Sequence, residues 1–73
     1  MREVPVRDGE ITLGQLLQVA GLADTGGQAK LILQTDEVLV NDEPEARRGR
    51  KLHVGDTVEV TGHEPMRVVA ADG

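Results

Sequence analysis

The sequence of 73 residues contains no cysteine, no serine and no aromatic residue. Without cysteine the chain can form no disulfide, no thiolate metal site and no cysteine nucleophile. Without phenylalanine, tyrosine or tryptophan the core must be aliphatic, and nucleic-acid bases cannot be held by stacking on aromatic rings. Threonine and two lysines are the only side-chain nucleophiles left. We therefore expect a protein that is not an enzyme and has no catalytic residue.

Long apolar runs are also missing. No segment approaches the about 18 apolar residues that a membrane span needs, and the first residues, Met-Arg-Glu-Val-Pro, lack the apolar part of a signal peptide. We expect a cytoplasmic protein without membrane contact. A chain this short makes one domain, residues 1–73, and buries about 60% of its unfolded surface. We expect no large enclosed active site, no cofactor and no small-molecule substrate.

Basic residues are few, and half of them lie together. The net charge is −5, from thirteen acidic and eight basic residues. Residues 46–55 carry four basic side chains and no acidic one, so the other 63 residues sum to −9, from four basic and thirteen acidic. Charges farther apart than a Debye length of about 8 Å are largely screened at physiological salt. The basic segment can therefore attract a polyanion although the whole chain is acidic.

Two capping boxes predict two short helices close together. Thr12 is followed three residues later by Gln15, and Thr25 by Gln28. In this pattern a hydroxyl and an amide side chain satisfy free backbone N–H groups at the start of a helix. Gly21 is a stop signal between them. Apolar residues follow each cap at helical spacing: Leu13, Leu16, Leu17 and Ala20 in the first helix, and Ala29, Ile32 and Leu33 in the second.

Alternating apolar residues predict strands at 2–7, 38–41, 57–61 and 66–70. We expect the first and last to be flanking edge strands, since Pro5 lacks the N–H that a central strand uses. Asn41-Asp42 is predicted to form a hairpin turn. Asp36, between helix and strand, is expected to adopt a positive φ. The fold class is therefore α+β, with two short N-terminal helices packed on a small, mainly antiparallel sheet.

Four short motifs occur in a fixed order: Gly-Gly-Gln-Ala-Lys at 26–30, Glu-Val-Leu-Val-Asn at 37–41, Arg-Arg-Gly-Arg-Lys-Leu at 47–52 and Val-Gly-Asp-Thr-Val-Glu-Val at 54–60. This order resembles the S4 RNA-binding domain, or alpha-L motif, and above all its small stand-alone bacterial members. The resemblance covers about residues 11–61. It implies a domain that binds structured RNA, ribosomal or transfer RNA, through the second helix and the basic loop, in association with the ribosome in some relatives.

The chain departs from the family pattern at a few positions. Asp36 and Asp42 stand where the family commonly has glycine, and the first helix lacks the basic residue often found at its start. The two carboxylates add negative charge beside the implied RNA face. These departures bear on affinity for RNA more than on the fold.

Arg47, Arg48, Arg50 and Lys51 are the main candidates for RNA contacts, with His53 as an extra phosphate or ribose contact. The planar fork of arginine matches the oxygens of a phosphate. The alternative is that this run of charge is an ordinary solvated face. His53 and His63 are the only imidazoles, so we expect no metal site.

The start of the second helix supplies four further candidates. Gly26 and Gly27 lack Cβ atoms where exposed amides and the helix dipole favour an anion, so a phosphate could approach closely. Close packing of the two helices explains these glycines equally well. Gln28 is a cap first and an RNA contact second. Lys30 is either an RNA contact or an ordinary surface lysine.

Two other interpretations of the chain stay open. A β-grasp sulfur carrier has a similar order of segments, but it acts through a C-terminal Gly-Gly, and this chain ends in Ala71-Asp72-Gly73. Alternatively, the arginine-rich segment binds an acidic protein partner, because a basic loop does not distinguish phosphate from carboxylate. We expect a monomer, although the edge strand around Val4 leaves dimerisation open.

Overall fold

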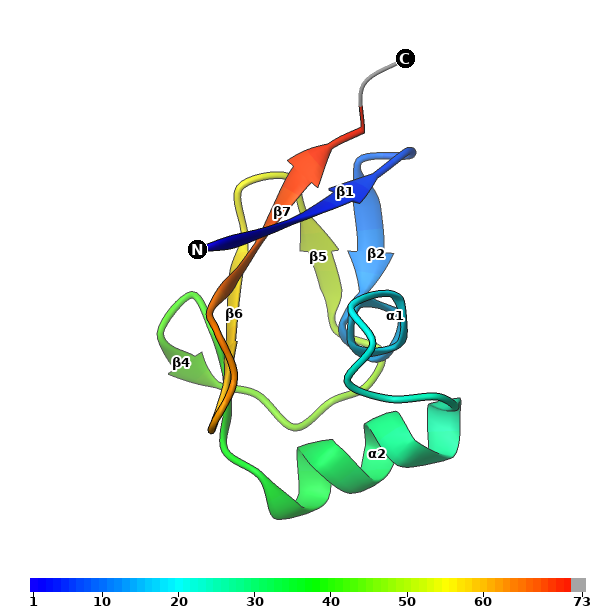
Figure 1. The fold of residues 1–73 in the computed structure, drawn as a ribbon, viewed down its shortest axis with the longest axis vertical. Helices are drawn as coiled ribbons and strands as arrows, with labels where there is room; N and C mark the ends of the chain where they lie inside the picture. The colour runs from blue at the N-terminus through cyan, green and yellow to red at the C-terminus, as the bar shows by residue number, and fades with distance from the viewer. Residues whose placement is uncertain (72–73) are drawn as a thin grey trace.

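The chain folds into two α-helices and a small, mainly antiparallel sheet, and the computed structural model describes residues 1–71 (Figure 1). The large sheet has the strand order β1 (Arg2–Val6), β7 (Met66–Ala70), β6 (Thr57–Val60), β3 (Val38–Val40) and β4 (Glu43–Pro44). Within it only β1 and β7 run parallel. A separate ribbon pairs β2 (Glu10–Thr12) antiparallel with β5 (Lys51–His53). The predicted α+β fold class is confirmed.

The first helix, α1 (Leu13–Val19), has the predicted start and stop. The Thr12 hydroxyl accepts a hydrogen bond from the Gln15 N–H at 3.2 Å, and the Gln15 side chain accepts one from the Thr12 N–H at 3.1 Å. At the other end Gly21 has a φ of 83°, and the Leu22 N–H donates to the Leu17 carbonyl at 2.9 Å. This bond closes a Schellman motif.

The second helix, α2 (Gly26–Thr35), begins as predicted but differs at both ends in detail. The Thr25 hydroxyl accepts from the Gln28 N–H, whereas the Gln28 side chain accepts from the Asp24 N–H, so the second capping box is only half formed. Asp36 has φ −106° and ψ 153°, so the expected positive φ is wrong. The chain leaves α2 directly into extended backbone, and no left-handed residue is needed there.

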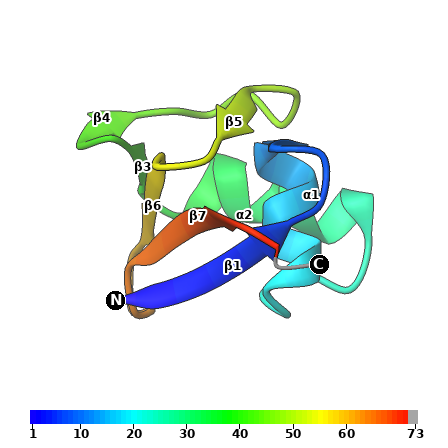
Figure 2. The same ribbon diagram turned by 90° about the horizontal axis from the view of Figure 1, so that it is seen from above.

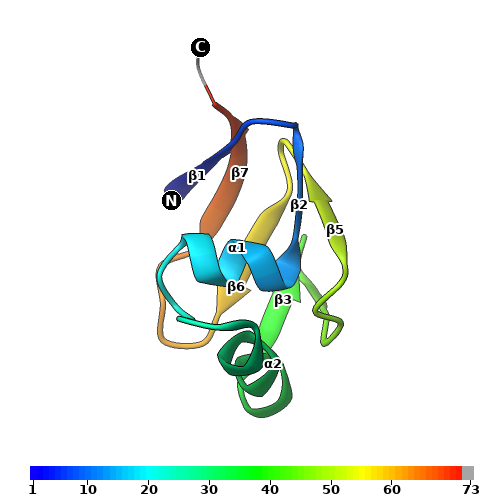
Figure 3. The ribbon, with the colours of Figure 1, turned by 90° about the vertical axis from the view of Figure 1, so that its right-hand side faces the viewer.

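One aliphatic core joins the helices to the sheet. Of the predicted helical stripes, Ile32 is only partly buried and packs against the core. The buried residues are the rest of those stripes, Ala23 and the inward side chains of the strands: Val4, Val6, Leu13, Leu16, Leu17, Ala20, Ala23, Ala29, Leu33, Val38, Val40, Leu52, Val58, Val60, Met66 and Val68. In Figure 1, β4 and β6 lie on the left, α1 with the β2–β5 ribbon on the right, and α2 along the bottom. In the side view (Figure 3), α1 lies above α2 and in front of β6.

Two expectations about strands need correction. β1 lies at the sheet edge, as Pro5 predicts, but β7 pairs on both sides, so residues 66–70 are not an edge strand. The β2–β5 ribbon was not predicted at all. Each of its strands has three residues, too few to establish a period, and in β5 only Leu52 is buried. Seen from above (Figure 2), the segment between β4 and β5 lies on the side opposite β1 and β7.

Neither helix within residues 1–71 is long and apolar enough to cross a membrane. Asp72 and Gly73, on which the sulfur-carrier interpretation depends, lie outside the described residues. These same two residues are the last two positions of the predicted 1–73 domain.

The β3–β4 hairpin provides a test of backbone strain. Asn41 and Asp42 both have positive φ, 51° and 69°, as the two central residues of a type I′ turn require, which confirms the predicted turn. Replacing Asp42 with glycine should raise the free energy of unfolding by about 0.5–1 kcal/mol, because glycine adopts this conformation without strain. Urea denaturation measures the change.

The Asp8→Gly variant is the control for Asp42→Gly. It removes the same charge and adds the same freedom to the unfolded chain, but Asp8 is not among the residues with positive φ. It should therefore lower stability. Equal effects of the two substitutions would contradict the strain argument.

Candidate functional site

Glu45 and the first part of the predicted basic segment form a loop between β4 and β5, which we call the arginine loop (residues 45–50). Its backbone is docked on the start of α1. The Leu13 N–H donates to the Arg50 carbonyl at 2.8 Å, and the Gly14 N–H donates to the Arg48 carbonyl at 2.9 Å. The first N–H groups of a helix have no partner within the helix. The arginine loop supplies those partners, so α1 determines where the loop lies.

A single carboxylate organises the loop from within. Glu45 Oε1 accepts from Arg47 Nη2 at 3.2 Å and from Arg50 Nη1 at 3.0 Å. Glu45 Oε2 accepts from the backbone N–H groups of Ala46 and Arg47 at 3.1 and 3.2 Å, and from Arg47 Nε at 3.3 Å. Hydrogen bonds from Arg47 and Arg50 lower the pKa of Glu45 to about 2. The loop therefore keeps its internal counter-ion at any physiological pH.

Arg48 joins the loop to both helices. Its stem lies directly over Gly14, where an added Cβ would collide with Arg48 Cγ and come within 3.3 Å of the Arg48 carbonyl oxygen. Its Nη1 donates to the Gly26 carbonyl at 3.3 Å, at the start of α2. A hollow of about 280 Å³ opens beside it, lined by Gln15 and Gln18 of α1 together with Gly26 and Arg48. The structure thus brings Arg48 and Gly26 together.

The glycines at the start of α2 are not explained by helix packing. A Cβ on Gly26 would meet no heavy atom closer than Arg48 Nη1 at 3.7 Å, and one on Gly27 none closer than Thr25 Oγ1, also at 3.7 Å. Both are ordinary contact distances. The interpretation that these glycines allow the helices to pack closely is therefore wrong.

The remaining two candidates on α2 are both exposed. Lys30 follows Gly26 by four residues, so it lies on the same side of α2 as the Arg48 contact. Gln28 accepts a hydrogen bond from the Asp24 N–H, which supports its role as a cap.

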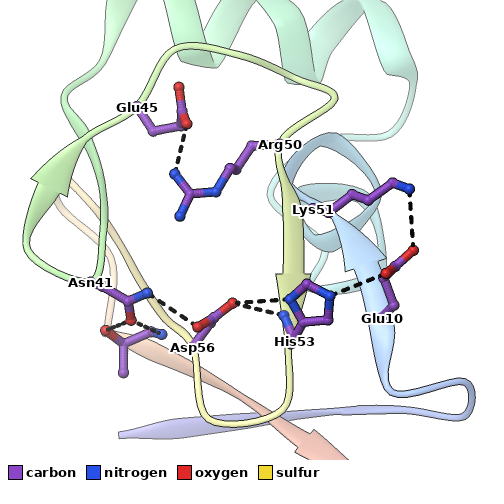
Figure 4. Close-up of polar contacts among 8 residues, drawn as sticks. Glu10, Asn41, Glu45, Arg50, Lys51, His53 and Asp56 are labelled. Carbon is purple, nitrogen blue, oxygen red and sulfur yellow. Dashed lines mark hydrogen bonds and ion pairs between the residues drawn. The ribbon is translucent and has the colours of Figure 1, made fainter.

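Lys51 and His53 point away from the arginine loop. On β5, His53 pairs with Glu10 of β2 and Lys51 with Thr12, and the Glu10 carboxylate is 3.7 Å from Lys51 Nζ and 3.1 Å from His53 Nε2. His53 Nδ1 is also 4.0 Å from Asp56 Oδ2. Figure 4 shows Arg50 turned towards Glu45 and Lys51 turned the opposite way, towards Glu10. The nine predicted residues therefore form two groups, one on the arginine loop and α2 and one on the ribbon.

Sequence reasoning missed the acidic partners of these basic residues. Glu45 immediately precedes the basic segment, and its place two residues before Arg47 is the one signal that was readable. Glu10 gave no signal, because it lies more than 40 residues from His53 in the chain. Among residues 1–71, no group of three or more histidine, aspartate or glutamate side chains is arranged to hold a metal ion.

A family model described as an S4 domain matches residues 4–69. The chain belongs to the S4 domain family. The stated resemblance is therefore confirmed, and the β-grasp interpretation is wrong, because the family match includes all nine strands and helices apart from the ends of β1 and β7. In this S4 domain the arginine loop, both helices and the ribbon all lie inside the matched range.

Two relatives of this S4 domain come from well-known bacteria. A Bacillus subtilis (strain 168) protein named "Probable ribosome maturation protein RlbA" is 58% identical over 59 residues, which cover 81% of this chain and 83% of the relative. An Escherichia coli (strain K12) protein named "Putative RNA-binding protein YbcJ" is 35% identical over 60 residues, which cover 82% of this chain and 84% of the relative.

The contact between Gly14 and Arg48 predicts the effect of a single methyl group. The Gly14→Ala variant should lose up to about 2 kcal/mol of stability, because overpacking costs about 1–3 kcal/mol and alanine returns about 1 kcal/mol of helix propensity. Thermal unfolding measures the loss. Gly49→Ala is the control, since no heavy atom lies within 4 Å of a Cβ built there. Equal melting temperatures for the two variants would contradict the prediction.

The low pKa of Glu45 predicts a pH dependence of stability. Its folded pKa of about 2 lies below the ordinary value of 4.5. The contribution of Glu45 is therefore complete above pH 4.5 and is lost as the pH falls towards 2. The difference in melting temperature between wild type and Glu45→Gln should accordingly be constant above pH 5 and shrink towards pH 2. A constant difference down to pH 2 would contradict the assignment.

Proposed function

We propose that this S4 domain docks structured RNA, with ribosomal RNA favoured over transfer RNA, on the arginine loop and the adjoining start of α2. The observation that carries the proposal is the docking of the loop on α1, which holds three arginines in one place beside the open glycine start of α2. RNA binding in general is supported by the family and by the relative named as RNA-binding. A relative named for ribosome maturation favours ribosomal RNA.

The proposed contacts differ in how much each is expected to contribute to RNA binding. Arg47 is more open than Arg50: 76% of the Arg47 side chain is exposed, against 35% of the Arg50 side chain. Arg48 and Lys30 border the start of α2, where Gly26 and Gly27 leave room for a phosphate. Lys51 and His53 contribute less, because Glu10 faces both of them and repels an anion.

Recognition in this proposal rests on RNA shape. Because the chain has no aromatic side chain on which a base can stack, we expect recognition to depend on contacts to phosphates and 2′-hydroxyl groups. Neutralising about three to five phosphates predicts a slope of about −2 to −4 for log affinity against log salt concentration. The acidic remainder of the chain repels RNA at other faces and so fixes its orientation. We propose no catalytic step, and we place this binding in the cytoplasm, with the protein acting as a monomer.

Removal of two loop charges tests the proposal in vitro. The double variant Arg47→Gln, Arg48→Gln should weaken binding to purified ribosomal subunits and reduce the salt slope by about 1.4–1.8 units. Arg7→Gln with Arg67→Gln is the matched control, because both arginines are exposed and lie outside the arginine loop. Fluorescence anisotropy of the labelled protein measures both. Equal weakening by the two double variants would show attraction by net charge alone.

Crosslinking in the cells of origin identifies the RNA itself. Tagged wild-type protein should recover a few discrete structured sites, and these should disappear for Arg47→Gln, Arg48→Gln. Recovery of an acidic protein in place of RNA would instead support the alternative of a protein-interaction module.

A further inference from the structure

Glu45 contacts two of the arginines in the proposed RNA site. Its carboxylate accepts five hydrogen bonds, two from backbone N–H groups and three from the side chains of Arg47 and Arg50. Only 11% of the Glu45 side chain is exposed, although it carries a charge. An acid placed against the basic cluster of an RNA-binding loop has two opposite explanations. It either competes with phosphate for the arginines or holds them in position for it.

The N–H groups of Arg47 that donate to Glu45 distinguish between these two explanations. Arginine has five N–H donors. Glu45 uses the Nε N–H and one Nη2 N–H, which leaves three of the five, two of them at the outer end of the guanidinium. That end can still bind a phosphate through two parallel hydrogen bonds. The carboxylate accepts hydrogen bonds along the side edge of the guanidinium. The outer end faces solvent, and 76% of the Arg47 side chain is exposed.

Arg50 is held by the same oxygen atom that accepts from Arg47 Nη2, so one carboxylate sets the distance between two arginines. A free arginine side chain loses much rotational freedom when it binds, and fixing it beforehand removes part of that cost. Both anchors of the arrangement are rigid: Glu45 donates its own N–H to the Val38 carbonyl at 2.9 Å, and the Arg50 carbonyl is bonded to α1.

We propose that Glu45 is a positioning residue for RNA binding, which holds the guanidinium groups of Arg47 and Arg50 in the arrangement that receives RNA phosphates. This inference rests on the proposed function. It makes a prediction opposite to simple electrostatics, since removing an acidic charge from an RNA-binding loop should then weaken binding.

The test compares two glutamates that differ in their contacts. Glu45→Gln removes the negative charge and with it the ion pairs to Arg47 and Arg50. Glu43→Gln removes the same charge two residues earlier on β4, and no ion pair found within residues 1–71 involves Glu43. The probes are purified ribosomal subunits and bulk transfer RNA, used separately. Glu45→Gln should weaken binding about threefold to tenfold, whereas Glu43→Gln should leave it unchanged or slightly tighter.

A double-variant background shows whether Glu45 acts through the arginines. With Arg47→Gln and Arg50→Gln already present, Glu45→Gln should cause no further weakening. NMR of the arginine Nε–H groups measures the Glu45–Arg47 hydrogen bond in the absence of RNA. The Arg47 Nε proton should exchange slowly with water in wild type and faster in Glu45→Gln. Melting temperatures show that each variant is folded at the temperature of the assay.

The outcomes are distinct. Tighter binding by Glu45→Gln would mean that the carboxylate competes with phosphate, and would overturn the inference. Equal effects of Glu45→Gln and Glu43→Gln on RNA binding would also overturn it. The same holds if Glu45→Gln still weakens binding in the Arg47→Gln, Arg50→Gln background. In each of these cases wild type still binds RNA, and the proposed function stands. If wild type binds neither probe, the proposed function fails, and the positioning role fails with it.

Discussion

The site depends on two hydrogen bonds from the start of α1 to the arginine loop. The N–H groups of Leu13 and Gly14 would otherwise have no partner in the helix, and the carbonyls of Arg50 and Arg48 satisfy them. A loop rich in like charges would tend to spread apart in solution. Here it is bonded to the most regular part of the fold, and Gly14 leaves the space in which the stem of Arg48 can lie.

Local charge compensation explains how a basic loop persists in an acidic chain. Glu45 neutralises part of the charge of Arg47 and Arg50 while leaving donors free, and Glu10 lies beside Lys51 and His53 on the ribbon. The first carboxylate lies within the loop and organises it. The second lies across the β2–β5 ribbon, beside two basic residues that point away from the loop. The same kind of contact therefore divides the basic residues into two groups.

Local signals predicted most of the fold. The cap at Thr12, the stop at Gly21 and the turn at Asn41-Asp42 depend on neighbouring residues, and each is present. The prediction failed where distant segments decide the outcome: β7 gains β1 as a second neighbour, and the β2–β5 ribbon joins residues about 40 positions apart. The positive φ expected at Asp36 failed because the direction of the chain after α2 depends on where the sheet lies.

The sequence by itself determined the α+β class, the aliphatic core, the absence of aromatic stacking and the clustering of basic residues, because these follow from composition and short-range spacing. Only the tertiary structure decided which basic residues act together. Side-chain pairing depends on which elements meet in space, so Arg48 reaches α2, Arg47 and Arg50 share Glu45, and Lys51 and His53 face Glu10. Of those contacts, only the one between Glu45 and Arg47, two residues apart, has a signal in the spacing along the chain.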